Sequence, residues 1–145
     1  MAEPNPGVEV FIRPVTIEDY DAMIALWRSL PGIGLSEADA QPNIAAYLER
    51  NPGMSLAALK GDKLIGTILS GHDGRRGYIH HLAVSAAHQG RGVGRLLARE
   101  CLLRLKVAGI SKCHLFVFCD NPAKEFWQKL GWQQRSDILI MSKHI

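Results

Sequence analysis

The sequence predicts a mixed α/β (α+β) fold, and two patterns along the chain lead to this prediction. Short β-type runs alternate with longer stretches whose apolar residues recur at helical spacing. Some of these runs are joined by tight turns, which indicates antiparallel hairpins, and one pair is separated by a helix, which indicates a parallel crossover. No linker or repeat interrupts the 145 residues, so we expect residues 1–145 to form a single domain.

One strand and two helices are expected in the first third of the chain. Pro14 ends the strand, and Thr16 suits the N-cap of the helix that follows, because acidic residues lie in its first turn. A Pro-Gly-Ile-Gly stretch at 31–34 stops this helix. Pro42 suits the first position of the second helix, where proline is tolerated. The expected ranges are a strand at 8–13 and helices at 17–30 and 42–50.

Three strands and then an alternation of helices and strands are expected in the rest of the chain. The turn Gly61-Asp62 joins the first two of these strands into a hairpin. Gly109 stops a long amphipathic helix. The expected ranges are strands at 55–59, 64–70 and 78–84, a helix at 92–108, a strand at 114–118, a helix at 122–130, and a final strand or two from Trp132 onward.

Composition narrows the classes of protein to which the chain can belong. Its net charge of +3 is too mild to argue for nucleic-acid binding by itself. No apolar run approaches the roughly 20 residues of a membrane span, and the N-terminus lacks the pattern of a secretory signal. The cysteines form no CxxC pair, which suits a reducing compartment and does not suggest a metal site. We therefore expect a cytoplasmic protein with no nucleic-acid or membrane partner and no metal.

The most informative segment is the glycine-rich stretch 89–95, which follows an apolar strand and opens a helix. Helix N-termini present unpaired N–H groups, and glycines let a phosphate approach the backbone closely. The spacing fits neither a Walker A loop nor the dinucleotide fingerprint, whose third glycine would stand at Arg95. A pyrophosphate cradle is one interpretation, and a turn that needs glycine for its conformation alone is the other.

Two motifs resemble those of the GNAT family, the Gcn5-related N-acetyltransferases. The stretch Gln89-Gly90-Arg91-Gly92-Val93-Gly94 is similar to the family's Q/R-x-x-G-x-G/A motif. A second set resembles the family's N-x-x-A-x-x-F-Y-x-x-x-G-F segment, namely Asn121, Ala123, Phe126, Leu130 and Gly131-Trp132. The opening Ile12-Arg13-Pro14 is also similar, and the region from Gly77 to Gly94, with Lys143, resembles small bacterial members of the YpeA type.

This resemblance implies both a fold and an activity. The GNAT fold has a central mixed β-sheet flanked by helices on both faces, with splayed strands that form a slot for acetyl-CoA. The implied activity is that of an acyltransferase, which moves the acetyl group of its co-substrate acetyl-CoA to a primary amine of a small molecule or peptide by direct attack in a ternary complex. Dimers are common in the family, so a homodimer is a further expectation.

Two other interpretations stay open at this point. The first is a non-catalytic acyl-CoA-binding module of GNAT type that regulates a partner. The second is a nucleic-acid-binding domain that uses the basic face of the helix at 92–108. The second is disfavoured because Glu100 interrupts that face and no stacking aromatic residues are interleaved with it.

The resemblance also assigns residues to the co-substrate. The pantetheine arm would pair with backbone groups at Leu82 and Val84, and the pyrophosphate would lie on the amides of 89–95. Asn121 matches a side chain that contacts pantetheine, although a helix cap is an equally good role for asparagine. The implied cofactor-binding residues are Leu82, Ala83, Val84, Gln89, Gly90, Arg91, Gly92, Val93, Gly94, Arg95, Asn121, Phe126 and Trp127.

The residues for proton transfer depart from the family pattern. Trp127 stands where the family usually has a tyrosine general acid, and an indole cannot protonate a thiolate near neutral pH. Tyr78 stands where some members have a glutamate base. His80 is the candidate base, because imidazole suits this task and strand alternation places it on one face with Tyr78 and Leu82. A structural role is the alternative for His80, and His81 is expected to face the other way.

The acceptor amine is expected to bind near Trp27 and the loop from Leu30 to Leu35. This loop is neutral to apolar, with no acidic cluster that would suit a polycation, so polyamines and aminoglycosides are disfavoured. Arg75 and Arg76 have two interpretations, a clamp for a substrate carboxylate and an exposed turn tip, of which the turn tip is favoured.

Overall fold

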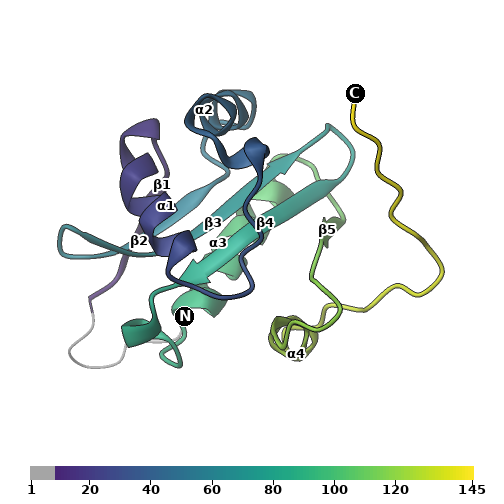
Figure 1. Cartoon of the computed structure of the whole chain (residues 1–145). Coiled ribbons are helices and arrows are strands. Elements are labelled where there is room, and N and C mark those ends of the chain that lie inside the picture. The colour runs from purple at the N-terminus through teal and green to yellow at the C-terminus, as the bar shows by residue number, and fades with distance from the viewer. Residues whose placement is uncertain (1–8) are drawn as a thin grey trace.

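The computed structural model describes residues 9–145, and its framework is a five-stranded sheet (Figure 1). In spatial order the strands are β1 (Phe11–Pro14), β2 (Leu56–Lys60), β3 (Lys63–His72), β4 (Gly77–Val84) and β5 (Cys113–Leu115). Neighbouring strands are antiparallel except β4 and β5, which are parallel. The sheet is therefore mixed, which confirms the predicted fold class. Val8, the expected start of the first strand, lies outside the described residues.

Helices cover both faces of this sheet (Figure 1). One face carries α1 (Tyr20–Arg28) and α2 (Gln41–Arg50), and the other carries α3 (Val93–Val107) and α4 (Ala123–Lys129). Short 3-10 turns precede three of these helices, namely η1 (Ile17–Asp19), η2 (Glu37–Asp39) and η3 (Ala86–His88). Each face has its own apolar core, and among the described residues no helix is long and apolar enough to cross a membrane.

The strands β4 and β5 separate along their length. They pair only at their beginnings, where Gly77, Tyr78 and Ile79 lie opposite residues 113–115. Beyond Ile79 the edge of β4 that faces β5 has no partner strand among the described residues. The splayed strands that the GNAT resemblance implies are therefore present.

A β-bulge in β4 changes the faces on which its side chains lie. Because Leu69 pairs with His80 and Thr67 with Ala83, two residues of β4 lie opposite one residue of β3. His80 and His81 both contact aromatic rings of the α1/α2 face, whereas Leu82 packs on the α3 face. The expectation that His80 shares a face with Leu82, with His81 on the opposite face, is wrong, because strict alternation does not hold across a bulge.

The end of the chain also differs from the prediction. From Trp132 onward the chain forms no strand and runs as an irregular segment on the β5 side of the sheet (Figure 1). Its apolar side chains at 138–141 are exposed, with Leu139 89% and Met141 90% exposed. The predicted final strand is wrong here because an apolar run becomes a strand only through ladder pairing, and β5 has only three residues.

Candidate functional site

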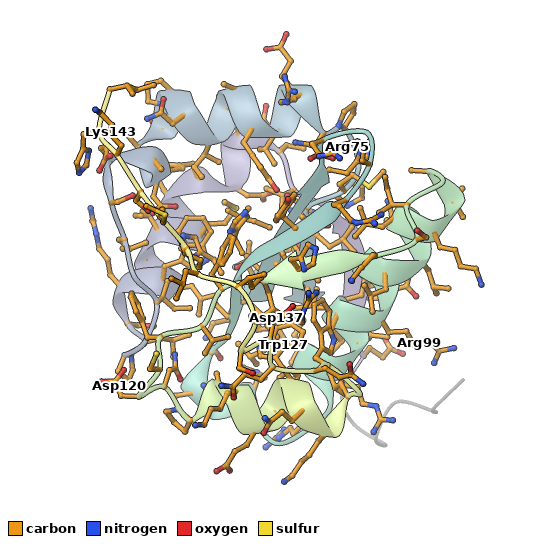
Figure 2. All side chains as sticks on the ribbon, turned by 90° about the vertical axis from the view of Figure 1, so that its right-hand side faces the viewer. Arg75, Arg99, Asp120, Trp127, Asp137 and Lys143 are labelled. Atoms are coloured by element: carbon orange, nitrogen blue, oxygen red, sulfur yellow. The ribbon has the colours of Figure 1, made fainter. Side chains whose placement is uncertain are left out.

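A cavity of about 370 Å³ occupies the space where β4 and β5 separate. Its walls come from the bulged part of β4, from the chain that follows β5, and from the loop at 32–34. Trp127 of α4 and Ile140 of the C-terminal segment complete it, and Figure 2 shows Trp127 on the side of α4 that faces the sheet. We call this cavity the slot.

A second cavity, of about 430 Å³, lies in front of the glycine-rich loop at the start of α3. Gly90 and Gly92 have φ of +77° and +83°, a backbone conformation that favours glycine, and a Cβ at either position would meet open space. The exposed backbone and the N-terminus of α3 therefore form a cradle for an anion. The lining shares Leu82, Ala123 and Trp127 with the slot, so the cradle and the slot adjoin.

Side-chain hydrogen bonds hold the glycine-rich loop against the end of β4. The Gln89 side chain donates to the Val84 carbonyl at 2.9 Å. The Ser85 hydroxyl lies 2.7 Å from Nδ1 of His88, and the Ser85 amide donates to the Ile65 carbonyl at 2.8 Å. These bonds fix the loop relative to β4, so Gln89 has a structural role in shaping the cradle.

Asn121 links α4 to the loop on the other side of the slot. Its side-chain oxygen accepts a hydrogen bond from the Ala123 amide at 2.9 Å, which is the capping-type contact that the sequence offered as one role. Its amide group lies 3.4 Å from the Gly32 carbonyl. Asn121 does not line either cavity, and its contact with pantetheine stays a prediction.

His81 is the most firmly held polar side chain of the slot. Its Nε2 atom lies 2.7 Å from Oδ1 of Asp39, and its ring packs on Trp27 with 4.9 Å between ring centroids. Asp39 in turn accepts a hydrogen bond from the Ser36 amide at 3.0 Å, and its carbonyl accepts one from the Tyr20 hydroxyl at 2.7 Å. The backbone of His81 has φ of +49°, which is uncommon for a residue other than glycine.

His80 also lines the slot, but its surroundings are aromatic. Its ring lies 6.2 Å from that of Tyr47 and 6.2 Å from that of Phe116, measured between centroids. Burial lowers the pKa of His80, and the nearby His81 lowers it further. Tyr78 lies nearer the start of β4, with 6.4 Å between the centroids of its ring and that of Phe116, and it does not line the slot.

The residues expected at the acceptor site occupy different environments. Trp27 is fully buried and donates a hydrogen bond from Nε1 to the Thr67 hydroxyl at 2.9 Å. Its ring is therefore fixed where it packs against the ring of His81. Leu30 packs against the core of the α1/α2 face, and Leu35 is 37% exposed. The loop between them does reach the slot through residues 32–34.

The remaining predicted residues are placed as follows. Trp127 is 7% exposed and packs edge-on against Phe126 and Trp132. Ala83 is buried on the α1/α2 face, and the side chains of Arg91 and Arg95 are exposed beside the cradle. Arg75 lies at the tip of the β3–β4 hairpin, away from Trp127 (Figure 2).

The hairpin tip is closed on itself. The Asp73 carboxylate accepts hydrogen bonds from the amides of Arg75 and Arg76, both at 2.8 Å. This contact supports the turn-tip interpretation of the two arginines.

Cys101 is a structural residue, because burial raises the pKa of its thiol to about 12 and leaves it protonated.

Sequence reasoning missed Asp39. A local signal for its capping role exists, since Ser36 and Asp39 form an S-x-x-D capping box around η2. Its contact with His81 has no such signal, because the two residues lie 42 positions apart.

Comparison with known proteins agrees with this geometry. The model of the Acetyltransferase (GNAT) family matches residues 20–132. The chain is 30% identical over 140 residues to "Acetyltransferase plu1384" of Photorhabdus laumondii, covering 92% of this chain and 94% of that protein. It is 27% identical over 135 residues to "Acetyltransferase SG1711" of Sodalis glossinidius, with the same coverage of 92% and 94%.

Solved structures share the fold. The PaiA N-acetyltransferase of Thermoplasma acidophilum, solved in complex with coenzyme A, aligns with a TM-score of 0.74 and 19% identity over 90% of this chain and 92% of that one. The N-acetylglutamate synthase of Neisseria gonorrhoeae, complexed with coenzyme A and N-acetyl-glutamate, aligns with a TM-score of 0.70 and 23% identity over 88% of this chain and 29% of that one. The YpeA-type subdivision stays a prediction.

Proposed function

This chain belongs to the GNAT family of acetyltransferases, and from that premise we propose that it transfers the acetyl group of acetyl-CoA to a primary amine by direct attack in a ternary complex. The observation that carries the proposal is the junction of the cradle with the slot, which share Leu82, Ala123 and Trp127. A ligand with a phosphate end and a thioester end fits this pair of cavities.

The cradle suits the pyrophosphate of coenzyme A. The open space in front of Gly90 and Gly92 lets phosphate oxygens reach the backbone N–H groups, and the dipole of α3 favours negative charge there. The exposed side chains of Arg91 and Arg95 add positive charge beside the loop. Two solved structures of this fold contain coenzyme A, which supports the same assignment.

The slot suits the thioester end and the reaction. Up to Ile79, β5 pairs with the edge of β4. Beyond Ile79 this edge is unpaired among the described residues, and its backbone groups can pair with the pantetheine arm instead. We assign the Leu82 N–H, at the bulge, to the acetyl carbonyl oxygen, where negative charge develops as the amine attacks. The imidazoles of His80 and His81 line the slot and can accept the proton that the ammonium group must lose.

We expect the acceptor to carry no charged group other than the amine that is acetylated. Among the described residues, the lining of the slot contains no Asp, Glu, Lys or Arg. A second ammonium group or a carboxylate inside the slot would therefore lose water without gaining a partner. A small molecule or a peptide segment with an apolar portion next to its primary amine fits this lining.

Trp127 distinguishes this protein from the family pattern. Its side chain touches both cavities, but an indole offers no proton for the departing thiolate. Water or the acceptor's own second N–H proton therefore serves this step. The same absence favours the alternative of a non-catalytic acyl-CoA-binding module, so the two functions need a direct test.

The test combines binding with turnover. Acetyl-CoA should raise the melting temperature of the protein by linkage, and a pooled screen of primary amines should release free coenzyme A thiol. Binding with no thiol release from any amine would support the regulatory module instead. Absence of both effects would contradict the proposed function altogether. The homodimer and the cytoplasmic location stay predictions.

A further inference from the structure

We infer that His81, held by Asp39, is the catalytic residue that takes the proton of the acceptor ammonium group, an inference that rests on the proposed function. His81 lines the slot and is one of the two residues of the bulge in β4. Its Nε2 atom lies 2.7 Å from Oδ1 of Asp39, and both side chains are largely buried, at 17% and 9% exposed. Asp39 acts through His81 and is therefore a positioning residue.

The Asp39 side chain fixes which nitrogen of His81 can act. An ionised carboxylate only accepts hydrogen bonds, so Nε2 of His81 carries the proton that it donates to Asp39. The lone pair of the neutral ring is then on Nδ1, and this is the atom that we assign to proton removal. When the ring takes a second proton, the adjacent carboxylate stabilises the imidazolium.

The surroundings keep this geometry in place. Oδ2 of Asp39 accepts from the Ser36 amide at 3.0 Å, and the Tyr20 hydroxyl donates to its carbonyl at 2.7 Å. The fully buried Trp27 packs under the imidazole and is itself fixed by its bond to Thr67. His81 adopts φ of +49°, and residues held in such sparsely populated backbone conformations cluster at active sites.

His80 is the weaker candidate for the same step. Three side chains surround it. They are His81, which follows it in β4, Tyr47 of α2, and Phe116 of the chain after β5. Its side chain forms no hydrogen bond with a described residue and has no carboxylate partner of its own. Burial, the largest effect, and the nearby His81 lower the pKa of His80, while the charge of Asp39 partly offsets them.

The proton and electron balance of the reaction is complete with this assignment. His81 Nδ1 takes one proton from R–NH3+, and the nitrogen lone pair that this uncovers forms the C–N bond to the acetyl carbon. The C–S bond breaks with its electron pair remaining on sulfur. The nitrogen loses a second proton as the amide forms, so that one of the two protons ends on the sulfur of coenzyme A and the other in solvent.

The experiment compares the pH profiles of kcat/KM of the wild type and its variants. The substrates are acetyl-CoA and a pool of primary amines that carry no other charged group. Asparagine tolerates the left-handed region better than most residues, so His81→Asn removes the imidazole with the least change to the backbone. We expect His81→Asn to lower kcat/KM by about 10²-fold and to abolish the rise of log(kcat/KM) through the imidazole range. Asp39→Asn should also lower kcat/KM, because an amide, which can donate as well as accept, no longer holds the His81 proton on Nε2.

Two further variants make the outcome specific. His80→Gln should keep a rise through the imidazole range, whatever its effect on rate, and His144→Asn, at the exposed end of the chain, should match the wild type. Loss of the rise in His80→Gln together with its survival in His81→Asn would overturn the inference. Equal melting-temperature shifts with acetyl-CoA in all variants would show that binding of the co-substrate is intact, so that a changed pH profile belongs to the proton-transfer step.

A nitrogen NMR measurement tests the inference without turnover. In the full-length protein labelled with 15N-histidine, the neutral form of His81 should carry its proton on Nε2, with Nδ1 unprotonated. The Asp39→Asn variant should lose this preference, because an amide can donate as well as accept a hydrogen bond. A neutral His81 protonated on Nδ1 would overturn the inference even if every amine in the pool were a poor acceptor.

Discussion

At the scale of single residues, two glycines show how one conformation serves two purposes. Gly92 begins α3 with φ of +83°, and Gly109 follows α3 with φ of +90°; a Cβ at either position would meet open space. Both therefore need glycine for their backbone conformation. Only Gly92 lies in the cradle, so a charged side chain should affect ligand binding at one position and not at the other.

The first prediction uses this pair. Gly92→Glu should abolish the rise in melting temperature caused by acetyl-CoA, because the new carboxylate fills the cradle and repels pyrophosphate. Gly109→Glu should lower the melting temperature through a similar backbone strain of about 1–2 kcal/mol while keeping the ligand-induced rise. Thermal unfolding with and without acetyl-CoA measures both. An unchanged rise in Gly92→Glu would place the phosphate site elsewhere.

The second prediction concerns Trp127, which packs between Phe126 and Trp132 and touches both cavities. Trp127→Tyr should leave kcat within a few-fold, because an enzyme without this acid already obtains the proton from water or substrate. Trp127→Ala should cost about 3–5 kcal/mol of stability, in the range of a buried tryptophan truncation, or weaken acetyl-CoA binding.

Single-turnover release of coenzyme A from both variants checks this prediction. A large rate gain in Trp127→Tyr would show that protonation of the thiolate limits the wild-type reaction. Unaltered stability and unaltered acetyl-CoA affinity in Trp127→Ala would show that the indole packs on neither the core nor the ligand.

The residues that sequence reasoning found and missed differ in how local their signals are. The cradle could be predicted because glycines, an apolar strand and a helix start are neighbours along the chain. Asp39 and His81 are 42 positions apart, and the bulge that turns His81 toward the α1/α2 face leaves no mark in an alternating pattern. The roles of both histidines in proton transfer stay predictions.

At the scale of elements, an ion pair ties β1 to the start of the first helical segment. The Arg13 guanidinium donates two hydrogen bonds, each of 2.8 Å, to the carboxylate of Asp19. That carboxylate also accepts from the Thr16 amide at 2.9 Å. The hydrogen bonds from Arg13 are the largest cause that lowers the pKa of Asp19.

The third prediction follows from the sign of this shift. Because the pKa of Asp19 is lowered in the folded state, the pair stabilises the protein above the unfolded-state value of about 3.9 and loses its effect as pH falls through the folded-state pKa. Asp19→Asn should lower the free energy of unfolding at pH 7 by about 0.5–1 kcal/mol, since the pair is partly exposed. The difference from the wild type should shrink below about pH 4.

Urea unfolding at a series of pH values measures this difference. Asp21→Asn is the matched control, because Asp21 is an exposed acid in the first turn of α1 and has no ion pair among the described residues. A difference between wild type and Asp19→Asn that stays constant from pH 7 to pH 3 would contradict the assigned role of the pair.

The elements themselves were predictable where the signal was local. Helix caps, Gly-Asp and Pro-Gly breaks and apolar periodicity indicated α1 to α4 and β1 to β5 in the order that the structure shows. One error came from the apolar run at 138–141, which carries strand propensity without a paired neighbour. Another is the strand predicted at 114–118, because β5 ends at Leu115 and residues 116–118 have no ladder partner among the described residues. Propensity describes what a segment suits, whereas a strand depends on the edge that it meets.

At the scale of the whole molecule, the charge is separated from the reaction site. The chain has a net charge of +3, with Arg91 and Arg95 exposed beside the cradle, yet no charged side chain of the described residues lines the slot. We therefore expect electrostatic attraction to act on the phosphate end of the co-substrate and little on the acceptor. We expect the apolar and aromatic walls of the slot to select the acceptor.

The fourth prediction tests this separation with three amines of known charge. 2-Phenylethylamine has an uncharged body, phenylalanine adds a carboxylate to the same skeleton, and spermidine adds further ammonium groups. We expect kcat/KM for 2-phenylethylamine to exceed that for each of the other two by about tenfold or more, because an extra charge that loses water without a partner costs at least about 1.4 kcal/mol. Thiol release at fixed acetyl-CoA concentration measures all three.

Raising the salt concentration should increase the KM of acetyl-CoA while leaving that of 2-phenylethylamine nearly constant, since screening weakens only the contacts with phosphate. Faster turnover of spermidine, or a KM for 2-phenylethylamine that rises steeply with salt, would show that charged groups outside the lining of the slot choose the acceptor.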